Sequence, residues 1–137
     1  RHLMEKAQEA LAKSYSPYSE FKVGAAVFLQ NEHTVTGANQ ENASYPMCLC
    51  AEMVTLSRVE SEFPGMVIET IAITVKGKKV AKRPAAPCGA CRQILFEKET
   101  RQEHPLRILI MGEIGPIFEL ASAKDLLPFA FGGDFLW

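Results

Sequence analysis

The sequence lacks a hydrophobic run long enough to cross a membrane, since none approaches the ~20 apolar residues of a spanning helix. No signal peptide is visible at its start, and it has no internal repeats, linkers or low-complexity segments. It also lacks an excess of one charge: 15 basic and 16 acidic residues give a net charge of −1. These absences argue against a membrane span, a repeat array or a generally basic surface for nucleic acid.

What remains is the composition of an ordinary globular protein. The 137 residues are 47% hydrophobic and 23% charged, and we expect them to form one domain over residues 1–137. Apolar periodicity predicts helices alternating with strands, which favours an α/β sandwich around one sheet. The expected helices are 1–13, 51–59 and 88–97, with a short final helix capped by Ser122, and the expected strands are 21–29, 34–37, 68–75, 107–111 and 117–120. The strongly aromatic segment 129–137 should cover a pocket or a neighbouring subunit.

Three cysteines and one glutamate carry the clearest chemical signal. Cys88 and Cys91 are three residues apart at the start of an expected helix, where they share one face. Cys50 lies upstream in the sequence Cys50-Ala51-Glu52. Thiolates hold zinc at about 2.3 Å, and a catalytic zinc keeps three protein ligands and a fourth position for water. The three cysteines can supply those ligands, and Glu52 is then a carboxylate beside the metal that is not needed to bind it.

A structural zinc site is the alternative for these cysteines. Such sites usually have four protein ligands, and Cys48 could be the fourth, with Glu52 merely solvated. A C-x-x-C pair alone would be a weak signal, because it also serves in redox and structural sites. Its combination with Cys-Ala-Glu favours catalysis. With three of four cysteines assigned to a metal, the sequence indicates a reducing compartment, and we expect a cytoplasmic protein.

A Cys-x-Glu followed at a distance by Pro-Cys-x-x-Cys matches the signature of zinc nucleobase deaminases in its three-cysteine form. The segments YSEFKVGAA (18–26), NQENASY (39–45), CAE (50–52) and PCGACRQ (87–93) resemble the cytidine deaminases. The resemblance spans nearly the whole chain, in the same order. It implies the short, homotetrameric form of that family with one zinc per chain. The implied fold is a three-layer α/β/α sandwich with a five-stranded mixed sheet.

Carried over to this chain, the resemblance gives the chemical roles. Cys50, Cys88 and Cys91 would bind the zinc, and Glu52 would be the proton shuttle. Hydroxide formed from water on the zinc would attack C4 of cytidine or 2′-deoxycytidine. The products would be ammonia and uridine or 2′-deoxyuridine, a reaction of pyrimidine salvage.

The resemblance also implies which residues bind the nucleoside. Asn39 and Glu41 would hold the ribose 3′-hydroxyl, and Phe21 would pack against the base. The Ala51 backbone and the Glu52 carboxylate would read the amide edge of the pyrimidine. These residues all belong to the segments that carry the resemblance.

The implied pocket is shared between subunits. Tyr45 and Phe131 would come from neighbouring subunits, with Phe131 stacking on the base, although Phe129 and Phe135 are close to it in the sequence. The implied partners are a small nucleoside substrate and further copies of this chain, with no nucleic-acid polymer and no membrane.

One position departs from the family pattern. Three-cysteine members commonly have an arginine directly after the glutamate, where this chain has Met53. Three thiolates and one Zn²⁺ sum to −1, so Arg92 and two helix starts would have to offset that charge. Blasticidin S-type deaminases also have an apolar residue there and are the alternative, but they lack the patterns at 21–26 and 39–43. A polynucleotide deaminase would need a basic channel, which the charge balance does not favour.

Overall fold

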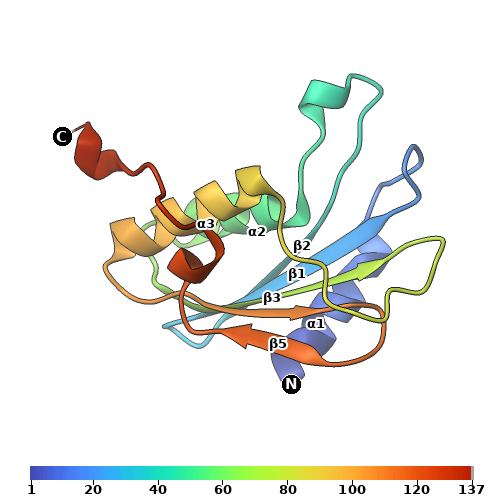
Figure 1. Cartoon of the computed structure of the whole chain (residues 1–137), viewed down its shortest axis with the longest axis horizontal. Helices are drawn as coiled ribbons and strands as arrows, with labels where there is room; N and C mark the ends of the chain where they lie inside the picture. Colours follow the sequence, from blue (N-terminus) through green and yellow to red (C-terminus); the bar gives the residue numbers. More distant parts are fainter. Residues whose placement is uncertain (137) are drawn as a thin grey trace.

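The computed structural model describes residues 1–136 and contains one five-stranded mixed sheet with helices on both faces (Figure 1). The α-helices are α1 (His2–Ala10), α2 (Ala51–Glu62) and α3 (Gly89–Gln102). The strands are β1 (Lys22–Leu29), β2 (Thr34–Ala38), β3 (Ile68–Lys76), β4 (Arg107–Met111) and β5 (Ile117–Leu120). The short 3₁₀ elements are η1 (Leu11–Lys13), η2 (Tyr45–Met47), η3 (Ala123–Leu126) and η4 (Gly133–Phe135). The predicted three-layer fold is confirmed.

The strands follow the order β2-β1-β3-β4-β5 across the sheet. β1 pairs antiparallel with both β2 and β3, and β4 pairs antiparallel with β5. β3 and β4 are parallel, and α3 makes the crossover that a parallel pair requires. The sheet is therefore mixed because one helical connection interrupts a series of antiparallel pairs.

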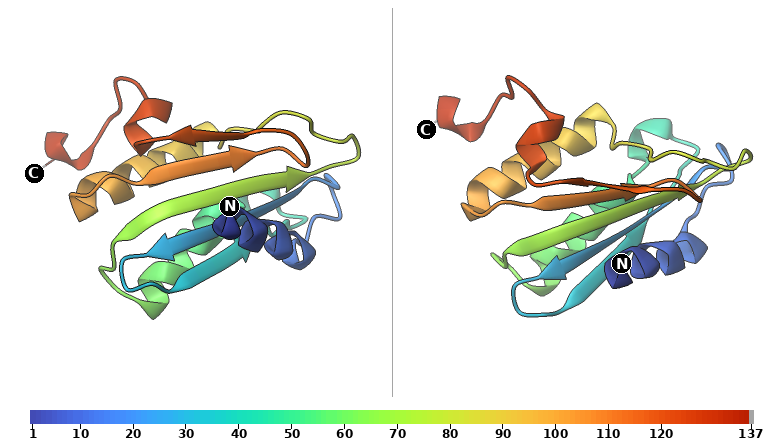
Figure 2. Two further views of the ribbon diagram at one scale, coloured as in Figure 1. Left: turned by 90° about the horizontal axis from the view of Figure 1, so that it is seen from below. Right: turned by 60° about the horizontal axis from the view of Figure 1, so that its bottom comes forward.

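The two faces of the sheet are covered differently, with α2 and α3 on one face and α1 on the other (Figure 2). The larger part of the hydrophobic core lies under α2 and α3 and is rich in β-branched side chains from β1, β3 and β4. The core under α1 is built from small and flexible residues: Met4, Ala7, Ala26, Ala72 and Leu109. A Cβ at Gly24 would collide with the main-chain oxygen of Ala7, so this glycine lets α1 lie close against the sheet.

The expected elements are present, and they differ from the sequence analysis mainly at their ends. The first helix changes to 3₁₀ geometry after Ala10, and the helix expected over 88–97 continues to Gln102. Ser122 caps the short final helix as expected: its hydroxyl accepts the Lys124 N–H, and the helix that it begins, η3, has 3₁₀ geometry. The expected aromatic segment includes residue 137, which lies outside the described residues. Within residues 1–136, no helix has both the length and the apolar character that a bilayer span requires.

A buried carboxylate joins α3 to the segments that follow it. Glu99 is 4% exposed, and its Oε2 accepts hydrogen bonds from the N–H groups of Leu106 at 2.7 Å and Ala123 at 2.9 Å. Its Oε1 accepts the Ser122 hydroxyl at 2.7 Å. Burial raises the pKa of Glu99, but these hydrogen bonds favour the charged form, and the resulting pKa lies below its usual value. The ionised side chain thus anchors the beginnings of β4 and η3 to α3.

Glu99→Gln should lower the free energy of unfolding by about 1–3 kcal/mol at pH 7, because buried N–H donors lose their charged acceptor. Since the folded-state pKa is lowered, this contribution is complete above the unfolded-state pKa of ~4.3 and is lost as the pH falls through the folded-state value. Urea unfolding should therefore show a gap between parent and variant that is full at pH 7 and closes in strong acid. Glu97→Gln, an exposed position on the same helix, is the control; equal effects from both would contradict the role of Glu99.

Candidate active site

The helix N-termini that carry the cysteines lie at one edge of the sheet. β2 and β3 both run antiparallel to β1, so they are parallel to each other and end at the same edge. α2 follows β2, α3 follows β3, and both helices return across the same face (Figure 1). Cys50 immediately precedes α2, Cys88 immediately precedes α3, and Cys91 lies in the first turn of α3. The topology therefore brings the three thiols together.

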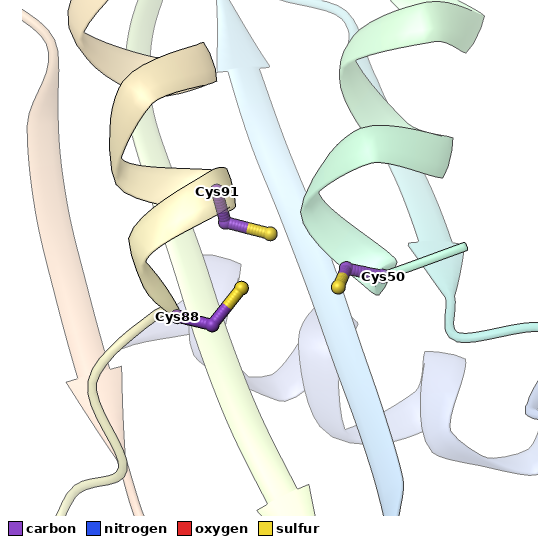
Figure 3. Close-up of side chains that lie close together, drawn as sticks. All are labelled: Cys50, Cys88 and Cys91. Carbon is purple, nitrogen blue, oxygen red and sulfur yellow. The ribbon is translucent and has the colours of Figure 1, made fainter. Parts of the chain in front are cut away.

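The sulfur atoms of Cys50, Cys88 and Cys91 point toward one another (Figure 3) and lie within 4.8 Å of one another. Zinc–sulfur bonds of about 2.3 Å at tetrahedral angles place sulfurs ~3.8 Å apart, so small side-chain movements let all three bind one ion. Three soft ligands leave the fourth tetrahedral position for water. This donor set fits the zinc cofactor that the sequence predicts.

Cys48, the alternative fourth ligand, makes other contacts. Its sulfur accepts a hydrogen bond from the Asn42 N–H at 3.3 Å and donates to the Asn42 carbonyl at 3.6 Å. The thiol thereby joins the two ends of the loop 42–48. Among residues 1–136, the group of side chains close enough to share a metal ion consists of the other three cysteines. The geometry is that of an open site rather than a closed four-cysteine site.

The thiols in this cluster alter one another's pKa values. A hydrogen bond from Cys91 lowers the pKa of the Cys50 thiol to about 6, against the opposing effects of burial and of the Glu52 charge. The pKa of Cys91 is raised, because its thiol donates that hydrogen bond and is buried close to Glu52. Metal ligation requires deprotonated thiols, so zinc binding releases protons and weakens as the pH falls.

Glu52 places an acid beside the cluster. It lies in the first turn of α2 and is 4% exposed. Burial raises its pKa, while a hydrogen bond from Cys91 acts in the opposite direction without cancelling the effect. A raised pKa brings a carboxyl group closer to the range in which it can both take up and release a proton. This is the property that general acid–base catalysis requires of a group next to a metal-activated water.

A cavity of about 300 Å³ opens at the cluster, at the lower limit of the ~300–1,000 Å³ typical of small-molecule sites. The residues from the sequence analysis that line it are Phe21, Asn39, Glu41, Cys50, Ala51, Glu52 and Cys88. Cys48 and Leu49 lie in the wall as well. The cavity therefore combines the metal-binding end with the side chains expected to bind a nucleoside.

The side chain of Asn39 is oriented by three hydrogen bonds. Its Oδ1 accepts the Ser14 hydroxyl at 2.6 Å and the Val23 N–H at 2.8 Å, and its Nδ2 donates to the Phe21 carbonyl at 2.9 Å. A primary amide has two N–H donors, so one remains for a ligand. Asn39 is thus a pre-oriented donor at the cavity wall, a detail that the sequence motif did not reveal.

Glu41 is held by the turn that precedes β1. Its Oε1 accepts the N–H groups of Tyr18 at 2.9 Å and Ser19 at 3.1 Å, and its Oε2 accepts the Ser19 hydroxyl at 2.5 Å. The hydrogen bond from the Ser19 hydroxyl is the main reason that the pKa of Glu41 is lowered. The carboxylate is therefore ionised, and its remaining lone pairs can accept a hydroxyl group of a ligand.

Tyr45 and Phe131, which the resemblance assigns to neighbouring subunits, lie outside the cavity of their own chain. Tyr45 is 69% exposed, and its ring meets that of Tyr18 edge-on with centroids 5.9 Å apart. Phe131 stacks on Phe135 at 5.4 Å, and its carbonyl accepts a hydrogen bond from Gln93 at 2.9 Å. Within one chain, the structure does not bring either ring to the cysteines.

Comparisons with known proteins agree with this geometry. Residues 1–103 match the family model for the cytidine and deoxycytidylate deaminase zinc-binding region. Cytidine deaminase of Mycobacterium tuberculosis (strain ATCC 25618 / H37Rv) is 37% identical over 93% of this chain and 86% of its own length. That of Halalkalibacterium halodurans is 37% identical over 96% of this chain and 93% of its own length. The crystal structure of cytidine deaminase from Burkholderia pseudomallei matches with a TM-score of 0.82 and 39% identity, covering 95% of this chain and 97% of that one. The chain therefore belongs to the cytidine and deoxycytidylate deaminase family.

Proposed function

We propose that this protein is a zinc-dependent cytidine deaminase, which hydrolyses cytidine and 2′-deoxycytidine to uridine and 2′-deoxyuridine with release of ammonia. The observation that carries the proposal is the position of the buried Glu52 carboxyl group, beside three clustered thiols and in the wall of a cavity of about 300 Å³. Membership of the deaminase family supports the same reaction.

Each chemical role falls to a residue at the cluster. Cys50, Cys88 and Cys91 hold the zinc, which supplies, when bound, the acidity that makes a water molecule nucleophilic near neutral pH. Glu52 accepts the proton released by that water and delivers it to N3 of the pyrimidine. The oxygen of the water bonds to C4. As the C4–N bond breaks, the same carboxyl group takes the remaining proton of the hydroxyl on C4 and passes it to the amino group, which leaves as ammonia, and the C4 carbonyl of uridine remains. The raised pKa of Glu52 suits a group that must both accept and donate a proton.

Nucleoside recognition is divided between the base and the sugar. Phe21 packs against the base, and the Ala51 backbone and the Glu52 carboxylate read its amide edge. Asn39 and Glu41 hold the 3′-hydroxyl from two sides, because a hydroxyl group can accept from the free amide N–H and donate to the carboxylate. The hydrogen bonds that already fix both side chains support this role, since a pre-oriented site loses little entropy on binding.

Neighbouring chains complete each pocket in a homotetramer. The exposed end of the chain supports an intersubunit contact: Phe129, Phe131, Phe135 and Leu136 are 106%, 58%, 69% and 70% exposed. Aromatic side chains in this number are typical of an interaction surface rather than of a free end. Tyr45 and Phe131 enter neighbouring sites, where Phe131 stacks on the base. Four free cysteines fit a reducing compartment. We therefore place the enzyme in the cytoplasm, where it would act in pyrimidine salvage.

The reaction is tested by incubating the zinc-loaded protein with cytidine, 2′-deoxycytidine, cytosine, adenosine and blasticidin S, and by measuring ammonia together with the loss of pyrimidine absorbance. Conversion of both cytosine nucleosides with equimolar ammonia supports the proposal. A strong preference for blasticidin S would assign the chain to the antibiotic deaminases. Failure to convert either nucleoside would contradict the proposal.

Cys91→Ser should lose zinc, whereas Cys48→Ser should keep one zinc ion per chain. The reason is that the Cys91 sulfur belongs to the cluster of three, whereas the Cys48 sulfur is hydrogen-bonded to the main chain of Asn42. Metal analysis after dialysis against a weak chelator measures the difference. Equal zinc loss from the two variants would place Cys48 among the ligands.

Glu52→Gln should retain zinc and the fold but lower kcat by at least about 10²-fold, since the amide cannot carry the proton. Steady-state kinetics with parallel zinc analysis checks both parts. Glu62→Gln is the matched control, because Glu62 lies on the same helix at an exposed position. A Glu52→Gln variant with nearly normal kcat would mean that the proton takes another path.

Removal of the 3′-hydroxyl from the substrate should lower kcat/KM by about 5- to 150-fold, equivalent to ~1–3 kcal/mol for polar groups left unpaired in the site. Kinetics on 3′-deoxycytidine and cytidine measure this loss, and free cytosine should be poorer still. 2′-Deoxycytidine retains the 3′-hydroxyl and is the matched control, which should lose much less. Similar values for cytidine and 3′-deoxycytidine would remove this role from Asn39 and Glu41.

A further inference from the structure

Arg92 directly follows Cys91, and its guanidinium group is hydrogen-bonded to main-chain carbonyls of two separate segments. Nε donates to the Pro87 carbonyl at 2.8 Å, and Nη1 donates to the Leu126 carbonyl at 3.2 Å. The side chain is half-buried. The charge that was expected to offset the thiolates is therefore engaged in joining the segment before α3 to the end of η3.

The first of these contacts acts on the peptide that leads into Cys88. The Arg92 side chain binds the Pro87 carbonyl, while the Arg92 main-chain N–H binds the Cys88 carbonyl at 2.9 Å. One residue thus holds the carbonyl groups on both sides of Cys88. Because the two peptide planes determine the direction of the Cα–Cβ bond between them, Arg92 limits the positions that the Cys88 sulfur can reach by rotation about that bond.

Packing does little to fix this part of the chain. Cys88 is exposed, whereas Cys91 is buried. A Cβ placed on Gly89 would meet no atom of the same chain within 4 Å, so no other part of that chain packs against the turn on this side. Residues 77–88 contain no helix or strand. Hydrogen bonds, rather than side-chain burial, must therefore keep Cys88 at the distance from Cys91 that a shared metal ion requires.

The second contact provides a fixed anchor. Leu126 ends η3, and η3 is attached to α3 through the buried Glu99, which binds both Ser122 and Ala123. The Leu126 carbonyl is therefore held to the same helix that carries Arg92. A guanidinium group bridging this anchor and the Pro87 carbonyl limits the movement of the turn before Cys88.

We propose that Arg92 is a positioning residue for the zinc site, which clamps the peptide before Cys88 to the end of η3 and so holds the Cys88 sulfur in the ligand cluster. A lysine would keep the charge, but its compact ammonium group lacks the planar fork that spans two carbonyls. The inference rests on zinc ligation by the three cysteines and is independent of which nucleoside is deaminated.

The test compares zinc-loaded parent protein with Arg92→Ala, Arg92→Lys and the control Arg101→Ala. Arg101 lies on the same helix, is exposed and pairs with Glu60 at 3.2 Å. Transfer of zinc to a chromophoric chelator gives the relative affinity, and the sulfur-to-cobalt charge-transfer bands of the cobalt-substituted proteins report the geometry of the thiolates. Both Arg92 variants should lose zinc about 10- to 100-fold more readily, the usual effect of removing a group that orients a ligand. Their charge-transfer bands should also change, and Arg101→Ala should match the parent.

Circular dichroism and the unfolding midpoint establish whether each variant is folded. If Arg92→Ala does not fold, the zinc affinity and cobalt spectrum of Arg92→Lys test the proposal. Full zinc affinity in Arg92→Lys would overturn the proposal, because charge alone would then be sufficient. Unchanged affinity and cobalt spectra in both variants would overturn it as well. A parent protein that binds zinc but deaminates no nucleoside would contradict the proposed function while leaving this comparison valid.

Discussion

The meeting of two helix N-termini at one edge of the sheet is the constraint on which the site depends. Because β2 and β3 are parallel and each is followed by a helix on the same face, Cys50 and Cys88 begin neighbouring helices and Cys91 completes the cluster. When the three thiolates bind Zn²⁺, as we propose, the net charge of the site is −1, and Met53, which follows Glu52, adds no positive charge. The N-terminal ends of both helix dipoles favour negative charge, by about 0.3–1 kcal/mol each and up to ~2 when partly buried. The fold itself therefore directs positive potential at the metal site.

The same arrangement separates the chemical and the recognition ends of the cavity. Glu52 is buried in the first turn of α2, where its raised pKa suits proton transfer. Asn39 and Glu41 lie in the chain that leads from β2 toward α2, and both are held by hydrogen bonds from the segment that precedes or begins β1. One rigid sheet thus positions both the helix starts that we propose for the chemistry and the loop that we propose for recognition, as in many enzymes whose loops carry function.

Local patterns explain what could be predicted from the sequence. The spacing of Cys88 and Cys91 and the periodicity of the apolar residues depend on a few neighbouring positions, so the cysteine cluster and the order of elements could be expected in advance. The bonds made by Glu99 and Arg92 join residues 23 and 34 positions apart, and no local pattern signals them. The short final helix could be expected as well, because the capping serine Ser122 is a local signal, but the sequence did not specify the 3₁₀ geometry that η3 adopts. The roles of Tyr45 and Phe131 stay predictions because they depend on a second chain.

The proposed reaction depends on an open zinc site formed by three thiols. Zinc K-edge X-ray absorption on the loaded protein measures the number and type of metal ligands directly. We expect three sulfur ligands at about 2.3 Å and one oxygen ligand, as for a catalytic ion that keeps a position for water. Four sulfur ligands around the zinc would contradict this expectation, because Cys48 would then close the site and leave no place for the reaction.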